Sequence, residues 1–287
     1  MNNRSTSAET IGAEDWAGAM GDRWLAHVDQ FESMIAPVGD ALLARADYQP
    51  GERVVDIGCG GGASSRAIAA RVAPGGRVMG VDISQALVAE CVRRAMAAGL
   101  TNLGFIAADA ASVQTAAAPF DRLHSRFGSM FFPEPAAAFR HLATLLRPGG
   151  RADFAVWAPA KDSPWVSELM QILRRHIDMP KPEPRAPGPF ALDDPNYFVS
   201  LLHPAGFVEL DFKLWRGRQL LGGTGASAQR AVEFLIKAMS FGDVVLEQSA
   251  SVQQRVKQEL QELFARHETA DGVSMEAIAW LVSARRC

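Results

Sequence analysis

The 287-residue chain has few of the residues that cross-link a protein or anchor a metal: it contains only three cysteines. Cys59, Cys91 and Cys287 are odd in number and far apart in the sequence, which argues against a disulfide framework and against a zinc cluster. No pair of histidines or carboxylates has the spacing of metal ligands, so we expect no metal. A reducing, cytoplasmic setting fits this composition best.

Long apolar runs and an excess of positive charge are also lacking. No run approaches the roughly 20 apolar residues that span a bilayer, and residues 1–15 have no apolar signal-peptide core. The net charge is −3 and lysine and arginine are scattered, so we expect neither a membrane nor a nucleic acid as partner. With 48% hydrophobic residues, the chain supports one large domain, or one domain with a sizeable insertion.

Short apolar runs alternate with helical stretches through the middle of the chain. The runs are continuously apolar, as buried parallel strands are, and right-handed crossovers would put helices on both faces of the sheet. The sequence therefore predicts a doubly wound α/β fold. The expected strands are 53–57, 77–81, 103–107, 120–127 and 151–157, and the helices between them are 63–72, 84–98 and 135–146.

The segments on either side of this pattern are more helical. Residues 13–47 have helical spacing, with a second helical run expected from Pro37 to Arg45. Residues 158–205 and 217–270 are expected to form a cap over the carboxyl edge of the sheet. We therefore divide the chain into three regions. Residues 1–47 form a helical segment expected to close a binding site, residues 48–157 form the core, and residues 158–287 form a cap or substrate region together with the last two strands. The later expected elements are helices 165–176, 195–202, 229–239 and 253–267, and strands 207–215 and 272–285.

The strongest motif is Asp56-x-Gly58-x-Gly60-x-Gly62, where an apolar strand runs into a glycine turn that opens a helix. Glycine is needed where the backbone turns tightly and must approach a ligand closely. Asp56 can order this loop or meet a positively charged group of a ligand. A tight strand-to-helix turn that binds nothing is the alternative.

Two further acids follow the next two expected strands. Asp82 comes 20 residues after Gly62, a spacing that suits a carboxylate accepting hydrogen bonds from a ribose diol. Asp82 could instead cap the following helix, although Ser84 can also do this. Asp109 could accept a hydrogen bond from an exocyclic adenine amine, but an aspartate at a strand end is common in loops.

These motifs resemble those of class I S-adenosylmethionine (SAM)-dependent methyltransferases, and the resemblance covers about residues 15–157. The glycine loop matches that family's loop, Asp82 its ribose acid and Asp109 its adenine acid. Residues 120–132 look like its fourth-strand motif, and residues 146–150 look like its turn before strand five. The pattern is closest to the branch of the ubiquinone and menaquinone biosynthesis methyltransferases.

The resemblance implies a Rossmann-like, seven-stranded, mostly parallel sheet with a late antiparallel strand, 272–285, beside 207–215. It also implies SAM as cofactor and S-adenosylhomocysteine as product, with Ser125 and Arg126 near the methionine part. The chain departs from the family in its longer, more helical region after residue 158. The cofactor-binding residues implied are Asp56, Gly58, Cys59, Gly60, Gly62, Asp82, Ile83, Asp109, Ala110, Ser125 and Arg126.

The protein's part in methyl transfer is mainly to align the acceptor with the methyl group and to exclude water. Because the cap is apolar and not basic, we expect a small, partly apolar acceptor, with O- or C-methylation favoured. His27 is the candidate base, since it lies on the helix expected to close the site. The helical insertion could equally serve a homodimer contact. The lining candidates, for which core packing is the alternative, are Trp24, Phe127, Met130 and Trp157.

Two other functions stay open from the sequence. A nicotinamide-dependent oxidoreductase would use Gly58, Gly60 and Ala63 as a G-x-G-x-x-A loop and Asp82 for the ribose of NAD. Against it, Asp109 and the turn at 147–150 have no role in that function. A non-catalytic protein that keeps SAM as a structural ligand is the second alternative.

Overall fold

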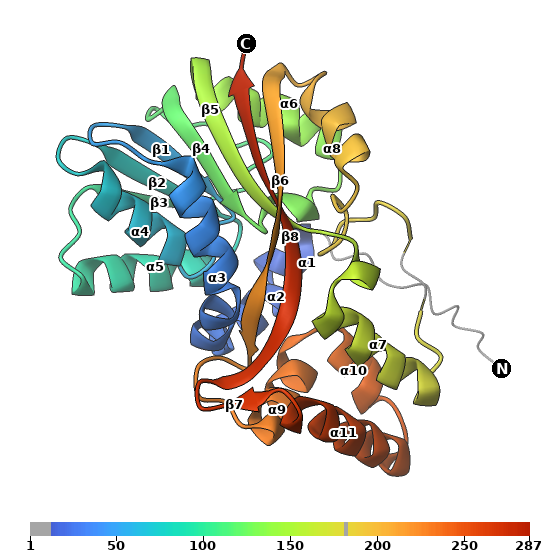
Figure 1. Ribbon diagram of the computed structural model, residues 1–287. Coiled ribbons are helices and arrows are strands. Elements are labelled where there is room, and N and C mark those ends of the chain that lie inside the picture. Colours follow the sequence, from blue (N-terminus) through green and yellow to red (C-terminus); the bar gives the residue numbers. More distant parts are fainter. Residues whose placement is uncertain (1–12, 181–182) are drawn as a thin grey trace.

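The computed structural model describes residues 13–180 and 183–287, and its centre is one twisted sheet (Figure 1). The strands follow the order β3-β2-β1-β4-β5-β8-β6, and the short β7 pairs with β8. The strands are β1 (Arg53–Ile57), β2 (Arg77–Asp82), β3 (Leu103–Ala107), β4 (Phe120–Arg126), β5 (Leu146–Trp157), β6 (Phe207–Leu221), β7 (Glu268–Thr269) and β8 (Gly272–Arg286).

Strand directions confirm the predicted doubly wound α/β fold. Strands β1 to β5 pair in parallel, whereas β8 is antiparallel to both β5 and β6. The expected late antiparallel strand is therefore β8, and it lies beside β6 as predicted. The two-residue β7 adds an eighth strand that the sequence did not predict, antiparallel to β8.

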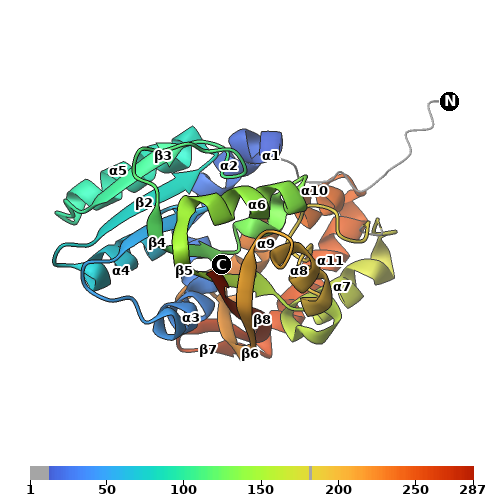
Figure 2. The same ribbon diagram turned by 90° about the horizontal axis from the view of Figure 1, so that it is seen from above.

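Helices cover both faces of the sheet (Figure 2). Helix α3 packs against α4, while α6 and α8 pack together on the opposite face. The prediction that residues 195–202, which form α8, belong to the cap is wrong: Phe198 packs against Phe139 and Phe154, so the apolar side of α8 is part of the core of the sheet. The helices named here are α3 (Val28–Ala46), α4 (Ala63–Val72), α5 (Gln85–Ala97), α6 (Pro135–Leu145) and α8 (Pro195–Leu202).

The N-terminal segment forms α1 (Ala13–Ala17), α2 (Ala19–Ala26) and α3. The prediction of a separate helical run that starts at Pro37 was wrong, because α3 continues through this proline. A proline inside a helix removes one backbone hydrogen bond. The buried residues of α3 nevertheless keep a spacing of three or four on both sides of Pro37, so packing on the sheet outweighs the local cost.

Beyond the carboxyl ends of the parallel strands lies a helical cap (Figure 1). Strands β6 and β8 reach into it: β5 ends where Trp157 pairs with Ala279, but the β6–β8 ladder continues to the pair Leu221 and Val273. No helix among residues 13–180 and 183–287 is long and apolar enough to cross a membrane. The cap helices are α7 (Pro164–His176), α9 (Ala228–Ala238), α10 (Phe241–Leu246) and α11 (Ala250–Ala265).

Candidate functional site

A glycine loop joins β1 to α4 at the carboxyl edge of the sheet. Gly58 and Gly60 have φ angles of 65° and 53°, in the left-handed region that favours glycine. A Cβ atom on Gly58 would lie 2.6 Å from the Cα atom of Gly128, in the loop after β4. Backbone therefore packs directly on backbone here, and the tight turn predicted from the glycines is confirmed.

Asp82, the last residue of β2, ties its own loop to the glycine loop. Its carboxylate accepts hydrogen bonds from the backbone N–H groups of Gly60 at 2.8 Å and Ser84 at 3.0 Å. The Ser84 hydroxyl accepts from the N–H of Leu87, so Ser84 caps α5 and leaves Asp82 to face the loops. Burial raises the pKa of Asp82. Each carboxylate oxygen has a further lone pair for a ligand hydroxyl.

Asp109 lies at the same edge of the sheet, after β3. Asp82 pairs with Ala107 in the β2–β3 register, and the N–H of Ala108 donates to the backbone carbonyl of Asp82 at 2.9 Å. The Asp109 side chain is exposed and accepts from the N–H of Ala111 at 2.8 Å. Because β1, β2 and β3 are adjacent, the glycine loop and the two acids with their neighbours Ile83 and Ala110 form one row, where α/β sheets bind ligands.

The first acid of the motif, Asp56, is turned into the protein instead. Its side chain is 1% exposed and accepts a hydrogen bond from the Ser65 hydroxyl at 2.6 Å. Burial raises its pKa to about 7, although the Ser65 hydrogen bond and the charge of Arg126 oppose the change. Of the two roles that the sequence left open, this geometry supports ordering of the loop, because Asp56 joins β1 to α4.

The remaining motif residues also make contacts inside the protein. The Ser125 hydroxyl donates to the carbonyl of Ile57 at 3.0 Å, which joins the ends of β4 and β1. The Arg126 guanidinium lies against α3, where a Cβ atom on Gly39 would be 2.7 Å from Nη1. Cys59 is buried, and its sulfur lies 3.0 Å from a Cβ position on Gly80. A role for these side chains near methionine stays a prediction.

Contacts from the N-terminal helices to the glycine loop were not predicted residue by residue. Glu32 of α3 accepts a hydrogen bond from the N–H of Ala63, at the start of α4, at 3.1 Å. The same carboxylate pairs with Arg66 at 3.6 Å and with Arg94 of α5 at 3.1 Å. Glu32 belongs to no sequence motif. Only the folded structure shows that the Glu32 carboxylate of α3 contacts both α4 and α5.

The predicted lining residues fall into two places. Phe127 follows β4 and stacks on Trp157 at the end of β5, with ring centroids 4.1 Å apart. Met130 is buried in the 3-10 turn Ser129–Phe131 that follows Phe127. Trp24 lies elsewhere: its indole Nε1 is 3.4 Å from a Cβ position on Gly60, so it faces the glycine loop.

His27 lies between α2 and α3. Its ring meets the ring of Phe234 of α9 edge to face, with centroids 5.7 Å apart. Burial lowers its pKa, and the positive charges of Lys237 and Arg23 lower it further. The imidazole is therefore neutral near pH 7, as a general base must be.

Sequence comparison assigns the middle of the chain. The family described as "Methyltransferase domain" matches residues 54–150. Nocamycin O-methyltransferase from Saccharothrix syringae is 39% identical over 116 residues, which are 40% of this chain and 41% of that protein. Aklanonic acid methyltransferase DauC from Streptomyces sp. (strain C5) is 34% identical over 118 residues, 41% of this chain and 54% of that protein. The matches thus span about half the length of these relatives, or less.

Solved structures agree with the fold over a longer stretch. The cyclase SpnF has a TM-score of 0.58 at 17% identity, and the match covers 98% of this chain and 99% of SpnF. The YcgJ protein from Bacillus subtilis has a TM-score of 0.54 at 18% identity, with 86% of this chain and 97% of YcgJ covered. At such identities the likeness shows the fold alone, and one fold hosts many functions.

Residues 54–150, with the glycine loop and both acids, are therefore a class I, SAM-dependent methyltransferase domain. SAM is the cofactor of this class, as the sequence predicted. The finer assignment to the ubiquinone and menaquinone branch is not singled out by these relatives and stays a prediction.

Proposed function

We propose that the whole chain is a methyltransferase that transfers the methyl group of SAM to a small, partly apolar acceptor, with O- or C-methylation favoured. One observation carries this proposal: the Asp82 carboxylate is fixed by the N–H of Gly60, so the ribose acid and the glycine loop form one unit. Around that unit, the sequence is that of a methyltransferase domain.

The residues present fit the cofactor. Gly58 and Gly60 have no side chains that would keep a ligand away from the loop, and Asp82 keeps lone pairs for the ribose hydroxyls. Asp109, exposed beside β3, would accept from the adenine amine. When bound, SAM supplies a methyl group on a positively charged sulfur that becomes neutral as the methyl leaves. The chain then has to bind the acceptor, orient it toward the methyl group and exclude water from the site.

A cluster of buried apolar side chains next to the glycine loop supports the nature of the acceptor. Phe127, just after β4, stacks on Trp157, the last residue of β5, and Met130 is buried in the turn that follows Phe127. The two relatives are named for small molecules, nocamycin and aklanonic acid, and one is named as an O-methyltransferase. An aromatic, partly apolar acceptor wall and methylation at oxygen fit both observations.

His27 is our candidate for a base. Its lowered pKa keeps the imidazole neutral, and its contact with Phe234 ties it to the cap. A base is needed only when the acceptor is not already acidic. We also propose that the protein works in a reducing, cytoplasmic setting, since its three cysteines are free thiols.

The first test is calorimetry with SAM and NAD titrated separately into the wild-type protein. We expect saturable SAM binding that Asp82→Ala loses. Asp121→Ala is a matched control, because Asp121 also accepts from a backbone N–H, that of Arg53, but at the amino edge of the sheet. This control should bind SAM like the wild type.

The outcomes separate the three functions. NAD binding without SAM binding would overturn the proposal in favour of the oxidoreductase. SAM binding without S-adenosylhomocysteine formation across a panel of phenolic and β-dicarbonyl acceptors would favour the non-catalytic binder. Formation of methylated product with at least one acceptor establishes the enzyme.

A further inference from the structure

The indole of Trp24 has a buried polar atom without a hydrogen-bond partner in the described part of the chain. Its Nε1 atom is shielded from solvent and has no hydrogen-bond partner among the described residues. The ring itself stacks on Phe31, with centroids 4.0 Å apart and planes at 4°, and meets Trp16 edge to face. A buried donor without an acceptor costs free energy, and a ligand that supplies the acceptor would remove this cost.

This donor faces the glycine loop. Nε1 lies 3.4 Å from the position that a Cβ atom on Gly60 would occupy. The N–H of the same glycine donates to Asp82 at 2.8 Å. The indole N–H of Trp24, a donor, and the carboxylate of Asp82, an acceptor, therefore both lie next to Gly60. A ligand with both hydroxyl donors and oxygen acceptors matches this arrangement, and SAM has both.

Two contacts from the middle of helix α2 hold it in place, and the indole with it. Gly21 packs on the residue that caps α5, and a Cβ atom there would be 2.8 Å from the Ser84 hydroxyl oxygen. Arg23 forms a two-pronged ion pair with Asp243 of α10 at 2.9 and 3.0 Å. The ring of Trp24 is thus positioned before any ligand arrives, which favours binding.

We propose that Trp24 is a cofactor-binding residue whose indole N–H donates to an oxygen of SAM above Gly60. The acceptor is a ribose hydroxyl or the methionine carboxylate. This inference rests on the proposed function, and it moves Trp24 from the acceptor wall, where the sequence had placed it, to the cofactor.

The test is calorimetric titration of S-adenosylhomocysteine into the wild type and three variants. Trp24→Phe keeps a ring that can stack on Phe31 but has no N–H, and we expect its Kd to rise about tenfold. Trp24→His restores a ring N–H and should recover part of the affinity. Trp165→Phe is the matched control, since Trp165 of α7 also has a buried indole N–H without a partner among residues 13–180 and 183–287, but lies against Trp157.

Several outcomes would overturn the inference. An unchanged Kd for Trp24→Phe would do so while leaving the proposed function intact, because the wild type would still bind. Equal losses in Trp24→Phe and Trp165→Phe would do so as well, because they would indicate general loosening. A wild type that binds no S-adenosylhomocysteine would overturn the proposed function and this inference together.

Adenosine, titrated into the same proteins, locates the acceptor oxygen. A similar loss for adenosine and S-adenosylhomocysteine in Trp24→Phe supports donation to the ribose. A loss confined to S-adenosylhomocysteine supports donation to the amino-acid carboxylate. Thermal unfolding of each variant verifies that the compared proteins are folded.

Discussion

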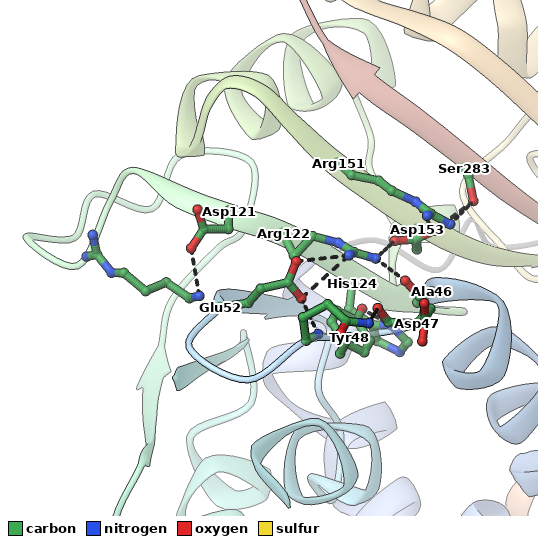
Figure 3. A network of polar contacts seen from close by, with 12 residues as sticks. Ala46, Asp47, Tyr48, Glu52, Asp121, Arg122, His124, Arg151, Asp153 and Ser283 are labelled. Atoms are coloured by element: carbon green, nitrogen blue, oxygen red, sulfur yellow. Dashed lines mark hydrogen bonds and ion pairs between the residues drawn. The ribbon is translucent and has the colours of Figure 1, made fainter. Parts of the chain in front are cut away.

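Arg122 of β4 donates a hydrogen bond to Asp153 of β5 at 2.9 Å, inside the sheet (Figure 3). Asp153 is fully buried and also accepts from the Ser283 hydroxyl at 2.7 Å. Arg122 reaches Glu52 at 3.1 Å and lies over the ring of Tyr48. A network of charges thus lies near the beginnings of the strands, opposite the edge of the sheet that holds the glycine loop.

Removing Asp153 should be costly, because it leaves buried positive charge without its partner. We expect Asp153→Ala to lower the free energy of unfolding by about 3–5 kcal/mol. Arg147→Ala is the control, since Arg147 pairs with Asp121 at 2.6 Å but is half exposed, and it should cost roughly 0–1 kcal/mol. Urea unfolding measures both, and equal costs would contradict the prediction.

Gly58→Ala should disturb both the fold and the cofactor site. The added Cβ atom would meet the Cα atom of Gly128 at 2.6 Å, and φ is unfavourable for alanine. Gly51→Ala separates the two effects, because Gly51 has a φ of 89° but nothing within 4 Å of its Cβ position. We expect Gly51→Ala to cost about 1–2 kcal/mol and to keep SAM affinity. Gly58→Ala should cost more and lose binding; unchanged affinity would refute this.

Asp56→Asn should change how stability depends on pH. Asp56 has a pKa of about 7 in the fold against an ordinary value of 3.8, so between these values the folded chain holds a proton that the unfolded chain has released. Its contribution to stability therefore falls as pH rises from about 4 to about 7. Asparagine does not ionise and can still accept from Ser65. The variant should gain stability relative to the wild type across this window.

Unfolding in urea at several pH values measures this difference. His124, whose pKa burial lowers to about 3, acts in the opposite direction below its ordinary value of 6.5. It is present in both proteins, so it largely cancels in the comparison. Parallel stability curves for the two proteins would show that Asp56 is not the titrating group.

His27→Gln should separate catalysis from cofactor binding. If His27 removes the acceptor's proton, kcat falls about 10²–10⁴-fold while the Kd for SAM stays the same. Because the pKa of His27 is lowered, wild-type activity should decline on acidification only below about pH 6.5, and the variant should lack this limb. His141→Gln, on α6 and bonded to the carbonyl of Val113, serves as control. Full activity in His27→Gln would exclude it as the base.

Local patterns were enough to predict most of the core. Strands β1 to β4 match their predicted bounds to within one residue, because apolar runs end at glycines or aspartates. The extension of β6 from Arg216 to Leu221 was missed, since its polar residues are held by pairing with β8, far along the chain. The break predicted at Pro37 was wrong for the same reason. A proline disfavours a helix locally, but α3 continues through it because the helix packs on the sheet, which the local sequence does not show.

The residues of the candidate site also differ in whether their contacts are local in the sequence. The glycines and Asp82 could be predicted because their contacts are made by neighbouring segments of one motif. The contact of Glu32 with Ala63 and that of Trp24 with Gly60 join the N-terminal helices to a loop some thirty residues further on. No local spacing encodes such contacts, so the sequence could predict a covering segment but not its contacts.

The β6–β8 ladder also decides how the cap behaves mechanically. It runs without interruption from the pair of Asp211 and Ser283 within the sheet to the pair of Leu221 and Val273 among the cap helices. An insertion joined by two loose linkers could swing or melt alone, but here both regions share a continuous set of backbone hydrogen bonds. Core and cap are thereby coupled into one cooperative unit, and loosening the cap strains the strand that completes the sheet beside β5.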